Sequence, residues 1–236
     1  MYCYSTSEYL RDVGTPERIV AAEKDIFNGY IKSRNLKNKQ KCIFLDRDGT
    51  INKYCGLLFK EEQFKLEKDV VEAIKMINES GYLAIVITNQ PVVARGLCSV
   101  EDIENIHNKM ETLLGVGGLF ESSFTYNQEK LVFQLVRHHP DKGYEGENST
   151  YKIKCHCRKP DIGMIEFCLK KFNIDLNTSW FVGDTTVDIK TGKNAELNTA
   201  LVLTGEAGND KKYDVQPDIV GSNLLEVIKK ILGVKK

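Results

Sequence analysis

Two aspartates separated by one residue are the first candidates for chemistry in this sequence. The apolar run Cys42–Leu45 leads into Asp46 and Asp48, and Gly49 follows. One carboxylate can attack phosphorus and form an acyl phosphate, while a second can protonate the leaving oxygen and later activate water. Two charges this close need a counterion, and carboxylate oxygens are ligands that suit magnesium. Asp-x-Asp-Gly is also common in solvated turns, so this motif alone leaves both interpretations open.

A second polar cluster follows the apolar residues 83–87. It consists of Thr88, Asn89 and Gln90. A hydroxyl and two amides can donate hydrogen bonds to phosphate oxygens without adding charge. The same three residues could equally form a capping turn.

Two charged clusters complete the set. Arg158 and Lys159 are adjacent cations that could neutralise the charge on a transferring phosphoryl group, although a basic pair can also be an ordinary solvated surface. The apolar residues 179–182 run into Asp184, with Asp188 four residues further on. Asp184 could complete an oxygen cage for a metal ion, with Asp188 behind it.

The elements that must position these clusters follow from the pattern after Lys41. Short apolar runs alternate with amphipathic stretches, which is typical of βαβ units around a parallel sheet. The expected strands are 42–45, 83–87, 179–182 and 199–203, with a weaker one near 131–136, and the expected helices are 70–79, 100–114, 162–172, 187–195 and 224–232. Ligands bind at the carboxyl ends of such strands, where the four clusters lie.

Taken together, the clusters resemble a known family. The sequences Phe-Leu-Asp-Arg-Asp-Gly-Thr, Thr-Asn-Gln, Cys-Arg-Lys-Pro and Val-Gly-Asp are similar to the four motifs of the haloacid-dehalogenase superfamily of phosphohydrolases. The resemblance covers residues 41–236, which we expect to form the phosphatase domain. It implies an α/β fold, a Rossmann-like parallel sheet with helices on both faces. The short spacing from Asp48 to Thr88 leaves little room for a large cap domain.

Within that superfamily the chain is most similar to the histidinol-phosphate and heptose bisphosphate phosphatases. The resemblance rests on Asp-Arg-Asp-Gly-Thr-Ile-Asn, Ala-Arg-Gly after Thr-Asn-Gln, and His-His-Pro leading to Cys-His-Cys-Arg-Lys-Pro. It implies a sugar-like phosphate substrate. The resemblance implies that Asp46 is the nucleophile, Asp48 the acid and base, Thr88 a hydrogen-bond donor to the phosphoryl group and Lys159 a catalytic cation. It implies substrate contacts from Asn89, Gln90, Arg158 and the loop at Gly56. The implied magnesium ligands are Asp46, Asp48 and Asp184.

A second metal is implied by the heptose branch, whose members commonly fold the loop before the Arg-Lys pair around zinc. His138, Cys155 and Cys157 match three of the usual ligands. Val136 occupies the position of the first cysteine and cannot bind metal, so His139, His156 or water would have to substitute. The alternative is a loop that has lost its zinc.

Residues 1–40 form a separate extension and linker. Residues 8–18 resemble the closing segment of sugar nucleotidyltransferases, and a helix is expected over 17–31 with apolar Ile19, Val20, Ile26 and Phe27 at helical spacing. One hypothesis is a remnant of a fused nucleotidyltransferase-phosphatase, with a nucleotidyltransferase as partner. The other is a helix that packs on the phosphatase domain.

Composition narrows the possible partners. The chain has 236 residues, with 42% hydrophobic and 28% charged side chains and 33 basic against 33 acidic groups, which is typical of a soluble globular protein. No apolar run is long enough to span a bilayer and no secretory signal is evident, so we expect a cytoplasmic protein. The resemblance to the histidinol-phosphate and heptose bisphosphate phosphatases implies a monomer. The odd number of cysteines, seven, favours thiols over disulfides.

The leading functional hypothesis is removal of the 7-phosphate from D-glycero-D-manno-heptose 1,7-bisphosphate. Histidinol phosphate is the alternative substrate. A polynucleotide 3'-phosphatase is disfavoured because the chain lacks the net basic charge that would hold a polyanion. The alternative from a different class is an inactive sugar-phosphate-binding or scaffold domain.

Overall fold

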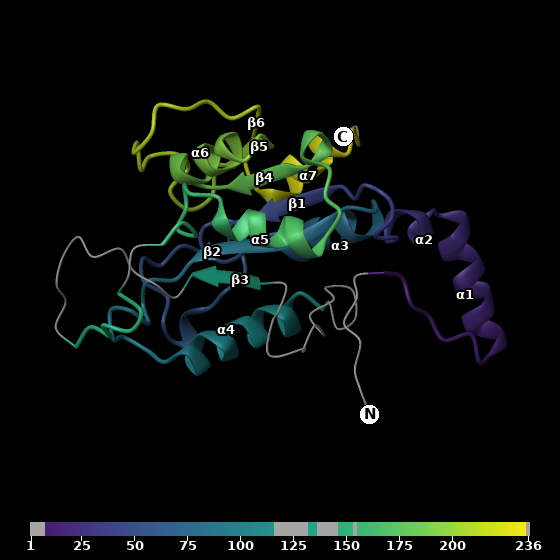
Figure 1. Cartoon of the computed structure of the whole chain (residues 1–236), viewed down its shortest axis with the longest axis horizontal. Coiled ribbons are helices and arrows are strands. Elements are labelled where there is room, and N and C mark those ends of the chain that lie inside the picture. Colours follow the sequence, from purple (N-terminus) through teal and green to yellow (C-terminus); the bar gives the residue numbers. More distant parts are fainter. Residues whose placement is uncertain (1–7, 116–131, 136–145, 153–154, 235–236) are drawn as a thin grey trace.

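The central strand of the fold, β1 (Cys42–Leu45), is buried along its whole length and is followed directly by Asp46. The computed structural model describes residues 8–115, 132–135, 146–152 and 155–234. In these residues six parallel strands form one sheet in the order β3-β2-β1-β4-β5-β6 (Figure 1). The other strands are β2 (Leu83–Asn89), β3 (Val132–Leu135), β4 (Trp180–Gly183), β5 (Asn198–Val202) and β6 (Ile219–Gly221).

Helices cover both faces of the sheet. Successive side chains of β1 point to opposite faces, and both sets are apolar, so each face needs helices to bury it. Ile43 and Leu45 pack into one apolar cluster with residues of α3 (Val70–Glu79), α4 (Val100–Leu113) and α7 (Leu224–Ile231). On the opposite face, Cys42 and Phe44 pack with α5 (Gly163–Lys171). Helix α6 (Thr186–Asn194) lies on this second face, where Gly192 approaches Phe181 of β4. The two-sided α/β fold expected from the sequence is confirmed.

Most predicted elements are confirmed to within a few residues. The exception at the carboxyl end is β6, a three-residue edge strand that is too short to give an apolar pattern of its own. The predicted helix over 17–31 is interrupted, because Asn28 caps α1 (Pro16–Phe27) and Gly29 adopts a φ of 78°. The short helix α2 (Tyr30–Ser33) follows that glycine. Two short 3₁₀ helices, η1 (Glu61–Gln63) and η2 (Leu176–Thr178), were not predicted.

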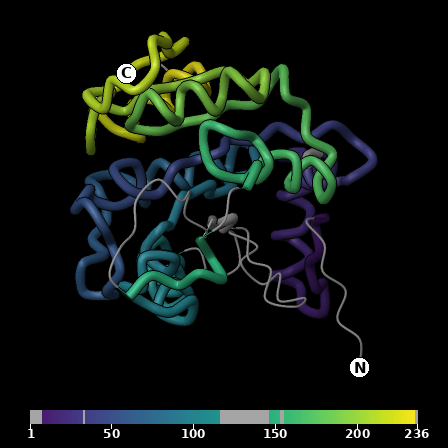
Figure 2. The backbone as a smooth tube through the Cα atoms, turned by 60° about the vertical axis from the view of Figure 1, so that its left-hand side comes forward, coloured from purple at the N-terminus to yellow at the C-terminus, as the bar shows by residue number. Residues whose placement is uncertain are grey.

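Helices α1 and α2 of the N-terminal extension lie far from the carboxyl ends of the strands (Figures 1 and 2). Helix α1 buries none of its residues, and Phe27 is 91% exposed. Contacts with the rest of the chain come from the segment after it, where the Tyr30 hydroxyl donates to the Glu79 carbonyl oxygen and the Asn173 amide donates to the Leu36 carbonyl oxygen. The apolar side chains of α1 therefore do not contribute to the described core.

The segment between the first two strands carries no large insertion. Between β1 and β2 the chain forms only a loop, η1 and α3. The expectation that this position holds no cap domain is confirmed. In the described part of the chain, no helix combines the length and apolar character needed to cross a bilayer.

Candidate active site

The four polar clusters meet in one cavity at the carboxyl edge of the sheet. The cavity has a volume of about 680 Å³. Ten of the twelve residues expected at the site line it: Asp46, Asp48, Gly56, Thr88, Asn89, Gln90, Cys155, Arg158, Lys159 and Asp184. Cys157 lies outside the lining, and His138 lies outside the described residues. The parallel arrangement thus brings together segments that are more than 130 residues apart in the sequence.

Lys159 is the buried cation of the site. Its Nζ donates to Oδ1 of Asp46 and to Oδ1 of Asp188, each at 2.6 Å. Although burial opposes its charge, Asp188 and Asp46 raise the pKa of Lys159 above its ordinary value. The ammonium therefore stays charged and ties the end of β1 to the start of α6.

Asp188 is positioned by the helix that carries it. It is the third residue of α6, and its Oδ2 accepts hydrogen bonds from the backbone N–H and the hydroxyl of Thr185, the N-cap residue. The Thr185 hydroxyl accepts in turn from the Asp188 backbone N–H. This capping box leaves Oδ1 of Asp188 turned toward Lys159.

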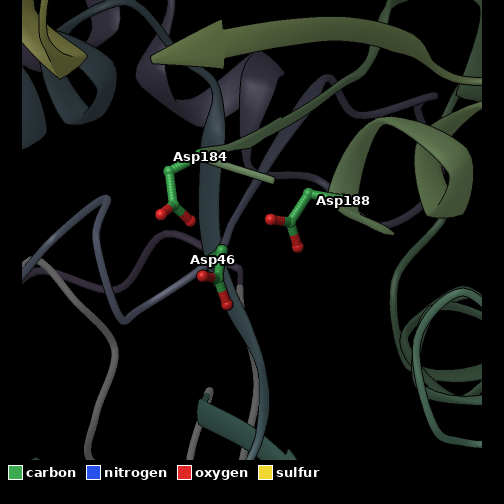
Figure 3. Close-up of side chains that lie close together, drawn as sticks. All are labelled: Asp46, Asp184 and Asp188. Carbon is green, nitrogen blue, oxygen red and sulfur yellow. The ribbon is translucent and has the colours of Figure 1, made fainter. Parts of the chain in front are cut away.

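Asp46, Asp184 and Asp188 form a compact acidic group. Their carboxylates point toward one another, with one oxygen of each within 4.8 Å of the others (Figure 3). Burial raises the pKa of Asp46 to about 7, with Lys159 opposing and Asp188 adding to the rise. Burial and the charge of Asp46 raise the pKa of Asp184 to about 8. The single positive charge of Lys159 therefore does not neutralise the three carboxylates when all of them are ionised.

The acidic group fits a divalent cation such as magnesium. Oδ2 of Asp184 accepts a hydrogen bond from the Glu206 backbone N–H at 2.7 Å. Oδ1 of Asp184 is buried and has no hydrogen-bond partner in the described part of the chain. A buried carboxylate oxygen without a partner is costly unless a ligand satisfies it. Hard oxygen donors and an excess of negative charge are what magnesium sites require.

Two glycines allow the chain to pack against Asp184. Gly49 follows the Asp-x-Asp pair with a φ of 83°, and Gly205 follows β5 with a φ of 57°. A Cβ atom at either position would overlap Oδ2 of Asp184. Side-chain-free residues are therefore required on both sides of this carboxylate.

Asp48 is held by three neighbouring side chains. Arg47 donates to both of its carboxylate oxygens, Asn52 donates to Oδ1 at 3.0 Å, and Gln90 donates to Oδ2 at 2.8 Å. Burial works against ionisation, yet the charge of Arg47 and these hydrogen bonds hold the pKa of Asp48 below its usual range. The two motif aspartates thus have pKa values shifted in opposite directions.

The amides after β2 contact protein groups within the site. Besides Asp48, the Gln90 amide donates to the Thr88 hydroxyl at 2.8 Å. Asn89 forms a reciprocal pair of hydrogen bonds with the backbone of Lys159, at 3.4 and 3.2 Å. Asn89 therefore fastens the Arg158-Lys159 loop to the end of β2.

Several cavity residues were not predicted as site residues. They are Arg95, Glu206, Lys212 and Tyr213. Asp188, expected only behind Asp184, lines the cavity itself, and Tyr54 lies in the loop expected around Gly56. A hydrogen bond between the side chains of Tyr54 and Glu206 raises the pKa of Tyr54 to about 12 and links two loops that line the cavity. Glu206 comes shortly after β5, so the strand-end argument that found Asp184 could have found it.

The expected zinc ligands are only partly described. Cys155 and Cys157 are both half-buried. The neighbouring His156 directs Nε2 toward Glu166 at 3.3 Å. Asp46, Asp184 and Asp188 are the one group of three or more potential metal ligands found in the described ranges.

The fold and the site define the chain as a HAD-like hydrolase. A family described as HAD-hydrolase-like matches residues 156–227. The structure superimposes with a TM-score of 0.66 on a D,D-heptose 1,7-bisphosphate phosphatase from B. bronchiseptica complexed with magnesium and phosphate, at 25% identity over 83% of this chain and all of that one. A putative HAD-like phosphatase from Mesorhizobium loti matches with a TM-score of 0.62, at 26% identity over 84% of this chain and 88% of that one.

Relatives in sequence identify the family within the HAD-like hydrolases to which the chain belongs. The chain is 35% identical over 199 residues to a D-glycero-beta-D-manno-heptose-1,7-bisphosphate 7-phosphatase from Pasteurella multocida, covering 83% of this chain and 99% of the relative. It is 34% identical to a D-glycero-alpha-D-manno-heptose-1,7-bisphosphate 7-phosphatase from Photorhabdus laumondii, covering 82% and 98%. The chain belongs to the heptose-1,7-bisphosphate 7-phosphatase family of HAD-like phosphatases.

Proposed function

We propose that this protein is a magnesium-dependent phosphatase that removes the 7-phosphate of D-glycero-D-manno-heptose 1,7-bisphosphate through an aspartyl-phosphate on Asp46. The observation that carries the proposal is the meeting of Asp46, Asp48, Lys159 and Asp184 in one cavity. The family relatives supply the substrate, since their names specify this sugar bisphosphate.

In the first half-reaction the Asp46 carboxylate attacks phosphorus. The bond from phosphorus to the sugar oxygen breaks as the aspartyl-phosphate forms, and that oxygen takes a proton from Asp48. Because the pKa of Asp48 is low in the free site, its carboxylate must take up this proton from solvent as the phosphate ester binds. Lys159 lies 2.6 Å from Asp46 Oδ1 and fixes the orientation of the nucleophile. Thr88 and Arg158 line the cavity, where their donors can bind phosphoryl oxygens.

In the second half-reaction water attacks the aspartyl-phosphate. Asp48 takes the proton of the water, the bond between phosphorus and the Asp46 oxygen breaks, and inorganic phosphate leaves. Asp46, Asp184 and the Asp48 backbone carbonyl would hold magnesium. The bound ion would neutralise the charge of the transferring phosphoryl group.

The substrate assignment is tested by measuring kcat/KM with magnesium on three phosphate esters. These are the two anomers of the heptose bisphosphate, assayed separately because relatives are named for either anomer, and histidinol phosphate. A preference of about 100-fold or more for a heptose bisphosphate supports the proposal. A comparable preference for histidinol phosphate would overturn it, and no release from any of them would favour the inactive-domain alternative.

Zinc binding by Cys155, Cys157 and His138 is the second part of the proposal. Support comes from the two half-buried thiols in the loop that leads to Arg158. Elemental analysis of purified protein should give one zinc per chain, and Cys155→Ser combined with Cys157→Ser should remove it. Zinc-free protein with unchanged thermal stability and turnover would contradict this assignment.

Residues 41–236 form the phosphatase domain in this proposal, and residues 1–40 form an extension without activity of its own. The absence of buried residues in α1 supports the division. The protein would act as a cytoplasmic monomer, with a sugar nucleotidyltransferase as its candidate partner. Light scattering after size-exclusion chromatography, alone and with such an enzyme, tests both statements. A dimer peak for the protein alone would contradict the monomer.

A further inference from the structure

A buried pair of side chains, Arg47 and His107, contacts Asp48 through Arg47. Arg47 separates the two motif aspartates in the sequence, yet its side chain is fully buried (0% exposed). Its Nη2 donates to Oδ1 and Oδ2 of Asp48 at 3.0 and 2.8 Å. Its Nη1 lies 3.1 Å from Nε2 of His107, a residue of α4 that is 1% exposed.

The chemistry of this contact fixes the state of the histidine. A guanidinium carries only hydrogen-bond donors, so Nε2 of His107 must accept from Arg47. The imidazole is therefore neutral, with its proton on Nδ1. His107 acts as a hydrogen-bond acceptor inside an otherwise apolar face of α4, whose other buried residues are Ile103, Ile106 and Met110.

The pair restricts how Asp48 can move. A guanidinium that donates to both oxygens of one carboxylate fixes the plane of that carboxylate. The third guanidinium nitrogen is held by His107, so the Arg47 side chain cannot rotate without leaving a buried donor unpaired. Asp48 still lines the cavity and its side chain is 22% exposed, so it is held by Arg47 and remains accessible to substrate.

We propose that Arg47, anchored by His107, is a positioning residue that holds Asp48 in place for its two proton transfers. The inference rests on the proposed phosphatase mechanism. In the first transfer the proton of Asp48 goes to the leaving sugar oxygen as its bond to phosphorus breaks. In the second, Asp48 takes a proton from the attacking water as the bond between phosphorus and Asp46 breaks. Both transfers require the carboxylate within hydrogen-bond reach of the reacting oxygen.

Substrates with different leaving groups distinguish a misplaced Asp48 from general damage to the folded site. A sugar alkoxide needs a proton to leave, whereas p-nitrophenolate leaves without one. The value of kcat/KM reports the steps up to departure of the leaving group. Loss of Asp48 positioning should therefore lower kcat/KM for a sugar phosphate much more than for p-nitrophenyl phosphate.

The test compares His107→Leu with His107→Gln in the full-length protein. Leucine removes the acceptor, and we expect kcat/KM for heptose 1,7-bisphosphate to fall about tenfold or more, with less than about a threefold change for p-nitrophenyl phosphate. Glutamine offers an amide oxygen to Arg47 and should restore most of the loss. Ile103→Val, a change on the same buried face without a hydrogen-bonding group, controls for altered packing.

Glycerol 3-phosphate is assayed as a second alkyl phosphate. If His107→Leu lost activity only on the heptose substrate, the cause would be poorer binding of that sugar, and the positioning role predicts a loss on both alkyl phosphates. A crystal structure of His107→Leu gives a readout independent of turnover, and the Asp48 carboxylate should leave its position between Arg47, Asn52 and Gln90. Equal losses on alkyl and aryl substrates would overturn the inference. An Asp48 side chain that keeps its place in the variant would also overturn it.

Discussion

Lys159 Nζ lies 2.6 Å from Oδ1 of Asp46, and both side chains are buried. The contact joins the end of β1 to a loop that is 113 residues further along the chain. A buried ammonium of this kind fixes one oxygen of the carboxylate and leaves the other for chemistry. Because the same ammonium also reaches Asp188, the nucleophile, the cation and the acidic group form one connected unit.

Asp46→Asn should abolish turnover while the protein stays folded. An amide cannot form the acyl phosphate, so we expect kcat to fall by about 10³-fold or more. Phosphate release with magnesium measures the loss, and thermal unfolding checks the fold. Asp69→Asn is a matched control, because Asp69 directly precedes α3, makes no side-chain hydrogen bond to cap that helix and lies outside the cavity lining. Substantial turnover by the Asp46 variant would exclude the aspartyl-phosphate mechanism.

Stabilisation by magnesium should increase with pH. A carboxyl group whose pKa is higher in the folded chain stabilises the fold only while it is protonated. For Asp46 and Asp184 that contribution is complete below the ordinary value of 3.8 and is lost as pH rises through about 7 and about 8, respectively. Their ionised forms are also the ones that bind the cation.

The difference in melting temperature between magnesium-saturated and EDTA-treated protein should therefore widen from about pH 5.5 to about pH 8.5. Differential scanning fluorimetry at several pH values measures it. Asp184→Asn removes one of the two carboxylates, so the difference in melting temperature should change less with pH in this variant. A difference that is constant across this range would show that these two groups do not bind the ion.

Gly205→Ala should weaken magnesium binding. A Cβ at this position overlaps Oδ2 of Asp184, whereas Gly29 has a similarly positive φ, 78°, with no atom within 4 Å of an added Cβ. Both substitutions cost about 1 kcal/mol because of the positive φ, but only the first displaces a candidate metal ligand, and it also presses on the Cα of Gly49, 2.6 Å from an added Cβ. Isothermal titration should give a magnesium Kd raised about tenfold or more for Gly205→Ala and unchanged for Gly29→Ala. Equal effects would mean that strain alone is responsible.

Tyr54→Phe should weaken substrate binding more than catalysis. The tyrosine hydroxyl bonds to the Glu206 side chain and joins two loops that line the cavity, and it is not a member of the acidic group. Without that bond we expect KM for the sugar phosphate to rise about threefold to tenfold, with kcat within about twofold. Tyr82→Phe, a buried tyrosine outside the cavity lining, is the control. A fall in kcat with KM unchanged would place the hydroxyl in the chemical step.

Residues at the ends of predicted strands could be located from the sequence. Asp46, Thr88 and Asp184 each follow an apolar run, and parallel strands place their carboxyl ends at one edge, so their meeting follows from the fold class. Asp188 was expected behind Asp184 and instead shares the acidic group. Thr185 and Asp188 match the spacing of a capping box, which could have indicated where that carboxylate lies.

Contacts between distant side chains could not be read from the sequence. Arg47 and His107 are sixty residues apart, and neither the Asp-Arg-Asp motif nor the amphipathic pattern of α4 indicates that they meet. The Gln90 amide was expected to contact substrate, and its hydrogen bonds to Asp48 and Thr88 depend on a rotamer that only packing determines. Local patterns specify elements and their ends, whereas such pairs depend on how helices are placed on the sheet.

The measurement that tests the central claim most directly is ³¹P NMR of D-glycero-D-manno-heptose 1,7-bisphosphate incubated with the purified protein and magnesium. We predict that the resonance of the 7-phosphate disappears as inorganic phosphate grows, while the 1-phosphate resonance persists and the Asp46→Asn variant leaves both unchanged. Loss of the 1-phosphate first, or a spectrum that does not change with the wild-type protein, would contradict the proposed function.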